Sequence, residues 1–175
     1  MQWIFTCKYK VIMSLGHKFR QAERILSTLA PADKKELEKV CREIRAAELE
    51  LHEKSGRLMR RCVEQCRGAC CRNLEVDSIV TRWDFLFILV SCPDFKENIL
   101  RCLKEENLFF PADCIFLENG TGPCIFPSNV RPEVCLVSFC DDTALIRKEI
   151  RGVRRKFFAL TWLVISKKPG LFLSF

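Results

Sequence analysis

The sequence predicts a mostly α-helical protein in which helices pack around an irregular, cysteine-rich centre. Apolar residues recur at spacings of three and four over long parts of the chain, as they do on one face of an α-helix. Pro, Gly and Asn residues that favour turns are concentrated between 108 and 140. Cysteine accounts for 12 of the 175 residues, and eight of these cysteines lie close to one another in sequence.

Residues 13–61 are predicted to form a helical hairpin. The first apolar stripe consists of Leu15, Phe19, Ala22, Leu26 and Leu29, and the second of Leu37, Val40, Ile44, Ala47, Leu51 and Leu58. Pro31 lies between the stripes, where it suits the first turn of a new helix. We expect the two helices to pack antiparallel. The same stripes could instead bind a protein partner or a second copy as a homodimer, and the sequence leaves this open.

The N-terminal residues do not resemble a signal peptide. No basic residue precedes the first apolar residues, and Lys8 and Lys10 interrupt them. Met13 is an alternative start, which would make 1–12 an over-called extension. Near the other end, the apolar run FFALTWLVI has nine residues, too few to cross a bilayer. We therefore expect a cytoplasmic protein with no membrane partner, in a compartment where disulfides rarely persist.

Three further helices are predicted. Thr81 and Asp84 have the spacing of a capping box ahead of the apolar run FLFILV, and Pro93 ends that helix. Residues 94–107 form the next helix. Residues 141–175 contain a last helix over about 143–167, which packs through Ile146, Ile150, Val153, Phe157, Leu160 and Val164.

The segment 62–140 contains the clustered thiols and is predicted to be a metal-binding domain. The stretch CVEQCRGACC supplies Cys62, Cys66, Cys70 and Cys71, and the turn-rich segment supplies Cys114, Cys124, Cys135 and Cys140. Thiolates are soft ligands that select zinc or iron–sulfur clusters. Neighbouring arginines, among them Arg67, Arg72 and Arg131, could offset the charge of such a site and donate hydrogen bonds to sulfur. No C-x-x-C pair is present, so a zinc ribbon or a thioredoxin-like motif is not predicted.

The order of these motifs resembles the YkgJ-type cysteine-cluster family. CVEQCRGACC, CIFLENGTGPC, the RPEVC motif ending at Cys135, and Cys140 follow one another as they do in that family, which is described as zinc- or iron-chelating. Related clusters occur in flagellin lysine N-methylases. Leu136 and Ser138 depart from the family pattern after Cys135. The resemblance implies eight metal or cofactor ligands, which are Cys62, Cys66, Cys70, Cys71, Cys114, Cys124, Cys135 and Cys140.

Three functions follow from this interpretation. The first is a protein that holds an iron–sulfur cluster, expected to be a 4Fe–4S cluster, with a redox role open. The second is a zinc-stabilised interaction module without redox activity. The third is an accessory to, or a member of, a lysine-methylating enzyme system. Because no Gly-rich cofactor loop and no acid–base pair with a clear role is present, no catalytic residue is assigned, and whether the protein is an enzyme stays open.

The remaining candidates are interpreted as structural. Cys7, Cys41, Cys92 and Cys102 are expected to be packing residues, as are Trp83 and Trp162. The net charge is +7 with both signs interspersed. The run Arg154-Arg155-Lys156 is interpreted as a solvated helix face, because no aromatic residues interleave with it in the way that nucleic-acid binding favours. No nucleic-acid partner is therefore predicted.

Overall fold

The computed structural model describes residues 14–58, 60, 69, 71–73, 75–106, 114–120, 123–139 and 141–169. The predicted mostly α fold is confirmed. The helices are α1 (Leu15–Thr28), α2 (Pro31–Lys54), α4 (Val76–Ile79), α5 (Arg82–Ser91), α6 (Lys96–Leu103), α7 (Glu133–Val137) and α8 (Arg147–Lys167). Short 3-10 turns lie between several of them. Within these ranges the only β pairing is an isolated bridge between Leu117 and Cys124.

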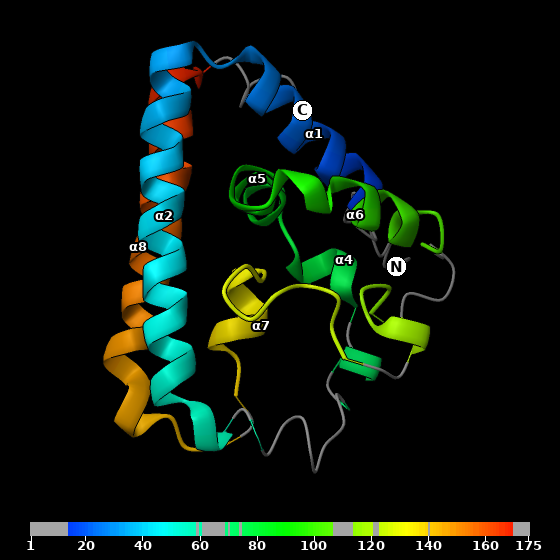
Figure 1. Cartoon of the computed structure of the whole chain (residues 1–175), viewed down its shortest axis with the longest axis vertical. Coiled ribbons are helices and arrows are strands. Elements are labelled where there is room, and N and C mark those ends of the chain that lie inside the picture. The colour runs from blue at the N-terminus through cyan, green and yellow to red at the C-terminus, as the bar shows by residue number, and fades with distance from the viewer. Residues whose placement is uncertain are drawn as a thin grey trace, which may run out of the picture.

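The two longest helices, α2 and α8, lie side by side along one edge of the molecule (Figure 1). Helices α1, α5 and α6 lie on the other side, and α5 also contacts α2 and α8 from the middle. All six residues of the predicted stripe on the last helix are buried. The stripe buries apolar area against α2 and α5, which is the main favourable term in folding.

The predicted antiparallel hairpin of the first two helices is wrong in its packing. Helix α1 packs against α5, while α2 packs against α8 (Figure 1). The two linking residues, Leu29 and Ala30, are both extended, with ψ angles of 139° and 155°. Pro31 then starts α2 directly. So short and extended a linker directs α2 away from α1 instead of back along it, and each helix buries its stripe on a different neighbour.

Aromatic rings fill the centre of the fold. The rings of Phe19 and Phe85 meet edge to face at 5.4 Å, and those of Phe87 and Phe157 at 5.2 Å, a geometry that aromatic pairs favour. Phe85, Phe87 and their neighbours on α5 are completely buried. Trp162 differs from the prediction: it is 63% exposed on the outer side of α8 and is not a core residue.

Ion pairs join the polar flanks of α2 and α8. Lys54 contacts Glu149 at 2.5 Å, and Lys156 pairs with Glu43. Because the lysine of each pair stays partly open to solvent, such pairs contribute little, typically about 0–1 kcal/mol each, and the apolar stripe dominates the packing of the two helices. None of the described helices is both long enough and apolar enough to cross a membrane.

The predicted capping box at the start of α5 is confirmed. The Thr81 hydroxyl accepts hydrogen bonds from the backbone N–H groups of Trp83 and Asp84, and the Thr81 N–H donates to the Asp84 carboxylate at 2.7 Å. The second carboxylate oxygen of Asp84 accepts from the Glu133 N–H at 2.8 Å. A buried cap thus holds the start of α7, the helix that contains Cys135, against the start of α5.

Candidate metal centre

A hairpin over 114–126 positions two of the predicted ligands. The Glu118 N–H donates to the Pro123 carbonyl at 3.0 Å, and the Ile125 N–H donates to the Phe116 carbonyl at 2.9 Å. At the turn, Asn119 and Gly120 have φ angles of 53° and 71°, in the left-handed region that Asn and Gly tolerate best.

The two arms of this hairpin repeat one arrangement. Cys114 and Cys124 each begin a Cys-Ile-Phe tripeptide. Burial raises the pKa of both thiols, and in each case the backbone N–H of the phenylalanine two residues on, Phe116 or Phe126, partly offsets that rise. The two phenylalanine rings contact each other, with centroids 4.8 Å apart. Hydrogen bonds from backbone N–H groups to sulfur favour the thiolate and are a known means of tuning metal–thiolate sites.

Two more predicted ligands lie close to the hairpin. The Cys114 N–H donates to the Cys71 carbonyl at 2.9 Å, which holds the backbone at Cys71 against the hairpin. Cys135, on α7, is near enough for the charges of Cys124, Cys114 and Cys71 to raise the pKa of its thiol. Four of the eight predicted ligands, from three separate segments, therefore lie in one region.

The thiols in this region resist ionisation. Burial, together with the charges of Cys124 and Cys71, raises the pKa of Cys114 to about 12. Burial likewise raises the pKa of Cys124, against the lowering effect of the Arg131 charge. Cys135 is open to solvent on one side, but the protein packed around it raises the pKa of its thiol well above the usual value. A cation would offset the mutual repulsion of the thiolates, so metal binding here would release protons.

Unpaired polar groups surround the thiols. The Nε atoms of Arg72 and Arg131 are buried, and neither has a hydrogen-bond partner within the described part of the chain. Arg72 follows Cys71 directly, and the charge of Arg131 acts on both Cys124 and Glu48. Buried donors without an acceptor are rare, because each costs about 1–3 kcal/mol. An anionic sulfur-ligated group would supply the acceptor that these two guanidinium groups lack.

Glu48 is a polar group that the sequence reading missed. It lies on the buried face of α2, completely enclosed, and its carboxyl oxygens meet no partner at ordinary hydrogen-bond geometry. Burial raises its pKa to about 9, and the Arg131 backbone N–H and charge offset this only in part. The only signal of this burial in the sequence was the position of Glu48, which follows Ile44 of the apolar stripe by one helical turn.

Not every predicted ligand can be placed. Cys62, Cys66, Cys70 and Cys140 lie outside the described residues, as does Cys7. In the part of the chain that is described, no three Cys, His, Asp or Glu side chains are grouped closely enough to hold a metal ion. Cys41 is buried in the core, as expected, and Cys92 packs against the hydrophobic core.

Cys102, on α6, also packs against the core, but it lies closer to the predicted ligands than a packing role requires. Its charge acts on both Cys114 and Cys124, so it belongs to the same region.

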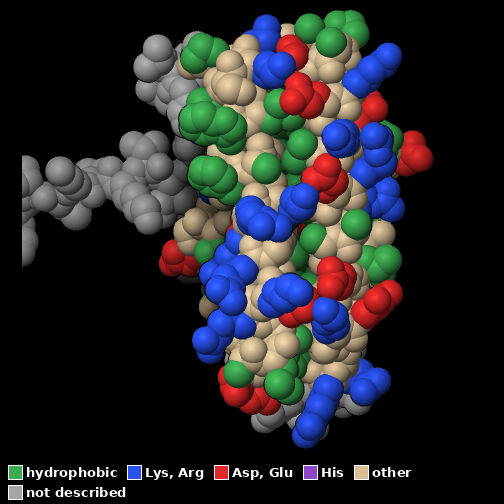
Figure 2. All heavy atoms as spheres, turned by 90° about the vertical axis from the view of Figure 1, so that its left-hand side faces the viewer, with side chains coloured by type: hydrophobic (Ala, Val, Ile, Leu, Met, Phe, Trp, Pro, Cys, Tyr) green, Lys and Arg blue, Asp and Glu red, His purple; other side chains and the backbone are tan. Residues whose placement is uncertain are grey.

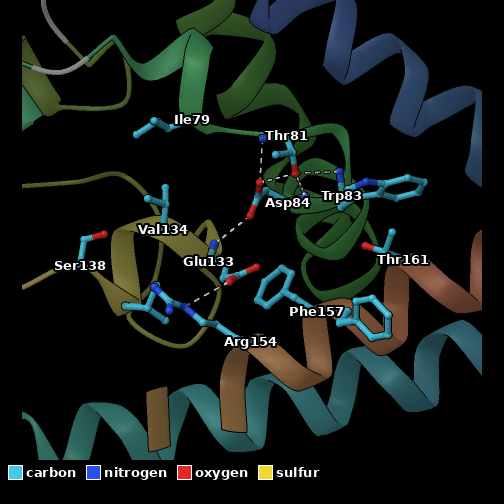
Figure 3. A pocket seen from close by; sticks show the side chains of 12 residues that line it. Ile79, Thr81, Trp83, Asp84, Glu133, Val134, Ser138, Arg154, Phe157 and Thr161 are labelled. Carbon is cyan, nitrogen blue, oxygen red and sulfur yellow. Dashed lines mark hydrogen bonds and ion pairs between the residues drawn. The ribbon is translucent and has the colours of Figure 1, made fainter. Parts of the chain in front are cut away.

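A pocket of about 480 Å³ adjoins α7 on the side of α5 and α8 (Figure 3). Its wall includes Trp83 and Phe158, and its polar groups include Glu133, Ser138 and Thr161. Glu133 is half-buried, and its pKa is raised by burial and by the charge of Asp84. The nearest cation is Arg154, whose Nε lies 3.9 Å from the carboxylate, too far for a good hydrogen bond.

No protein-family model matches the chain, and no curated protein or solved structure is significantly similar to it.

Proposed function

We propose that this protein binds metal and holds an iron–sulfur cluster through a subset of the eight clustered cysteines. The observation that supports the proposal most is the repeated Cys-Ile-Phe arrangement, in which the backbone N–H groups of Phe116 and Phe126 favour the thiolate forms of Cys114 and Cys124. Both cysteines lie at the edge of the hydrophobic core, against which they pack. The proximity of Cys71 and Cys135 to the same hairpin adds two further donors.

The residues present suit such a group chemically. Thiolates prefer iron–sulfur clusters or zinc, and the orphaned Nε–H donors of Arg72 and Arg131 suit an anionic site. When bound, an iron–sulfur cluster would supply one-electron redox chemistry. The chain would contribute the thiolate ligands and the N–H groups directed at sulfur, which together tune the reduction potential.

The test is metal content together with an ultraviolet–visible spectrum of protein purified without oxygen and without a nickel column. Brown protein with iron and acid-labile sulfide, absorbing near about 400 nm, is the expected result. Colourless protein with stoichiometric zinc would replace the cluster by a structural zinc site, and the protein would then be an interaction module. Protein without bound metal, even after anaerobic reconstitution with iron and sulfide or with zinc, would contradict metal binding altogether.

A further inference from the structure

The outer face of α8 has a composition that the fold does not explain. One stripe, called here the α8 stripe, consists of Arg147, Arg151, Arg154, Arg155, Phe158 and Trp162. Its members recur every three or four residues, so they lie on one side of the helix, over about 22 Å of its length. All six are exposed, Phe158 by 68% and Trp162 by 63%. The arginines come first along the helix and the aromatic rings follow.

The surface view shows the same division. Along α8, on the left of Figure 2, basic side chains gather over the first half of the helix and hydrophobic side chains over the second. On α2, to the right, acidic and basic side chains alternate. The acidic residue in the first turn of α8, Glu149, points to α2, where it pairs with Lys54. The α8 stripe thus presents basic charge without its own acidic residues.

The basic residues are also placed where they do not stabilise the helix. Arg147 and Lys148 lie in the first turn of α8, at the positive end of the helix dipole, where cations are unfavourable. Within the described part of the chain, Arg147, Arg151 and Arg155 form no salt bridge, and Arg154 has only the 3.9 Å contact with Glu133. A row of four arginines with no close acidic partner among the described residues, one of them at the unfavourable end of the helix dipole, favours an external anion along this face.

We propose that the α8 stripe binds single-stranded nucleic acid, with its arginines on phosphates and with Phe158 and Trp162 stacked on bases. Arginine pairs with phosphate through two parallel N–H groups and stacks on planar rings, and exposed aromatic side chains are the usual platforms for unpaired bases. The absence of interleaved aromatic residues in the sequence argued against this partner. The helix supplies them from the next two turns, and the proposal does not depend on bound metal.

The pocket next to the stripe favours a nucleic acid over an acidic peptide. Phe158 belongs to both, so a strand on the stripe can place one base in the 480 Å³ pocket beside Trp83. The amino group of adenine or cytosine would donate to the half-buried Glu133 carboxylate. An apolar peptide side chain would leave that carboxylate without a donor, and an acidic one would be repelled by it.

A membrane surface fits less well. An interfacial helix inserts its apolar face, but the apolar face of α8, with Val153, Phe157 and Leu160, is already buried in the core. On α8 itself, Phe158 and Trp162 are the large apolar side chains that remain exposed to a bilayer.

The test is fluorescence anisotropy of labelled single-stranded oligo(dA) and oligo(rA), titrated with the full chain over about 50–200 mM salt. We expect binding that weakens with salt. Arg151→Ala/Arg155→Ala should lower the slope of log Kd against log salt by about 1.4, since each phosphate contact on a single strand contributes about 0.7. The matched control, Lys35→Ala/Arg42→Ala, removes two exposed cations from α2 and should leave the slope unchanged.

The aromatic half of the stripe is tested separately. Trp162→Ala and Phe158→Ala should each weaken binding roughly 5- to 150-fold, the range for loss of one stacked base, with the salt slope retained. Leu145→Ala, which removes a 97% exposed leucine beyond the stripe, is the control and should bind like the wild type. Because all these residues are exposed, circular dichroism should show an unchanged fold in every variant.

Four results would overturn the proposal. The first is that neither oligonucleotide binds at low salt, and the second is that the α2 control loses as much affinity as the arginine variant. The third is that a duplex of the same length binds with equal affinity. The fourth is that unlabelled oligo(dA) and oligo(rA) both fail to displace the labelled oligonucleotide. Binding of polyglutamate or of anionic vesicles without binding of the oligonucleotides would assign the face to a protein or to a membrane instead.

Discussion

The backbone N–H of Cys114 donates a hydrogen bond to the carbonyl oxygen of Cys71 at 2.9 Å. This contact joins Cys71 and Cys114, which are far apart in sequence, and it does so through backbone atoms, without using either sulfur. Asp84 fixes the third segment by accepting a hydrogen bond from the start of α7. The thiol region is therefore assembled by the fold and not by the thiols themselves.

Loss of a thiol ligand should reduce bound metal and, with it, the yield of folded protein. We expect Cys135→Ser, and likewise Cys70→Ser, to lower the metal content and the yield of folded protein, because thiolate sites couple binding to folding. Metal content per chain and thermal unfolding with and without a chelator measure this. The control is Cys92→Ser, which removes a thiol that packs against the core elsewhere. Full metal retention in both Cys70→Ser and Cys135→Ser would contradict the ligand assignment.

The hairpin turn should tolerate an alanine poorly. Gly120 has a φ of 71°, and a Cβ there would meet no atom within 4 Å, so any cost comes from the backbone conformation alone. Gly120→Ala should destabilise the protein by about 1–2 kcal/mol and lower metal content, since the turn sets the positions of Cys114 and Cys124. Denaturant unfolding and metal analysis measure the two effects.

The matched control variant should change the stability in the opposite direction. Gly152 lies inside α8, and a Cβ there would also meet open space. Gly152→Ala should therefore stabilise the protein by about 0.5–1 kcal/mol through helix propensity. If Gly120→Ala were as stable as the wild type, the left-handed turn would not be a constraint on the hairpin.

The buried cap at Asp84 should stabilise the protein more than an ordinary helix cap does. Asp84→Ala removes the acceptor for the backbone N–H groups of Thr81 and Glu133 at once. We expect a loss of about 2–4 kcal/mol, which combines a lost cap with a buried unsatisfied donor. Urea unfolding checks this, with the exposed Asp94→Ala as the control expected within about 0.5 kcal/mol of wild type. Equal stabilities of the two variants would show that α7 is held by other contacts.

Features that depend on local sequence could be predicted, and features that depend on tertiary packing could not. The capping box at Thr81 and the buried stripe of α8 are set by residues within a few turns of one another. The pairing of α1 with α5 depends on which distant surface each stripe meets, and spacing alone does not contain that information. The same limit explains Trp162, whose apolar character predicted burial although its side of α8 is largely exposed.

The candidate site was predictable only in its chemistry. Clustered thiols indicated metal, and the repeated Cys-Ile-Phe tripeptide was a signal available in the sequence that only the hairpin made meaningful. Cys102 gave no such signal, because its approach to Cys114 and Cys124 depends on how α6 is placed. Glu48 also carried no such signal apart from its spacing from Ile44 in the apolar stripe, because a glutamate in a helix of alternating charges is normally exposed.

Glu48 makes stability depend on pH. Its folded-state pKa of about 9 lies above the usual value of 4.5, so the folded chain holds a proton that the unfolded chain releases. The contribution of the Glu48 carboxyl to the free energy of unfolding is fully present below about pH 4.5, and it is lost as the pH rises toward 9. Glu48→Gln keeps the neutral shape and removes this dependence. At pH 8 the variant should be more stable than the wild type by up to about 4–5 kcal/mol, with little difference at pH 4.

Chemical denaturation of the metal-free chain at a series of pH values measures this difference directly. The control is Glu53→Gln on the exposed face of the same helix, which should follow the wild-type curve. If Glu48 were instead ionised and paired with Arg131, Glu48→Gln would lower stability at pH 8, because the buried guanidinium would lose its counter-charge. The sign of the change at pH 8 therefore decides whether the carboxyl beside Arg131 is a neutral acid or an ion.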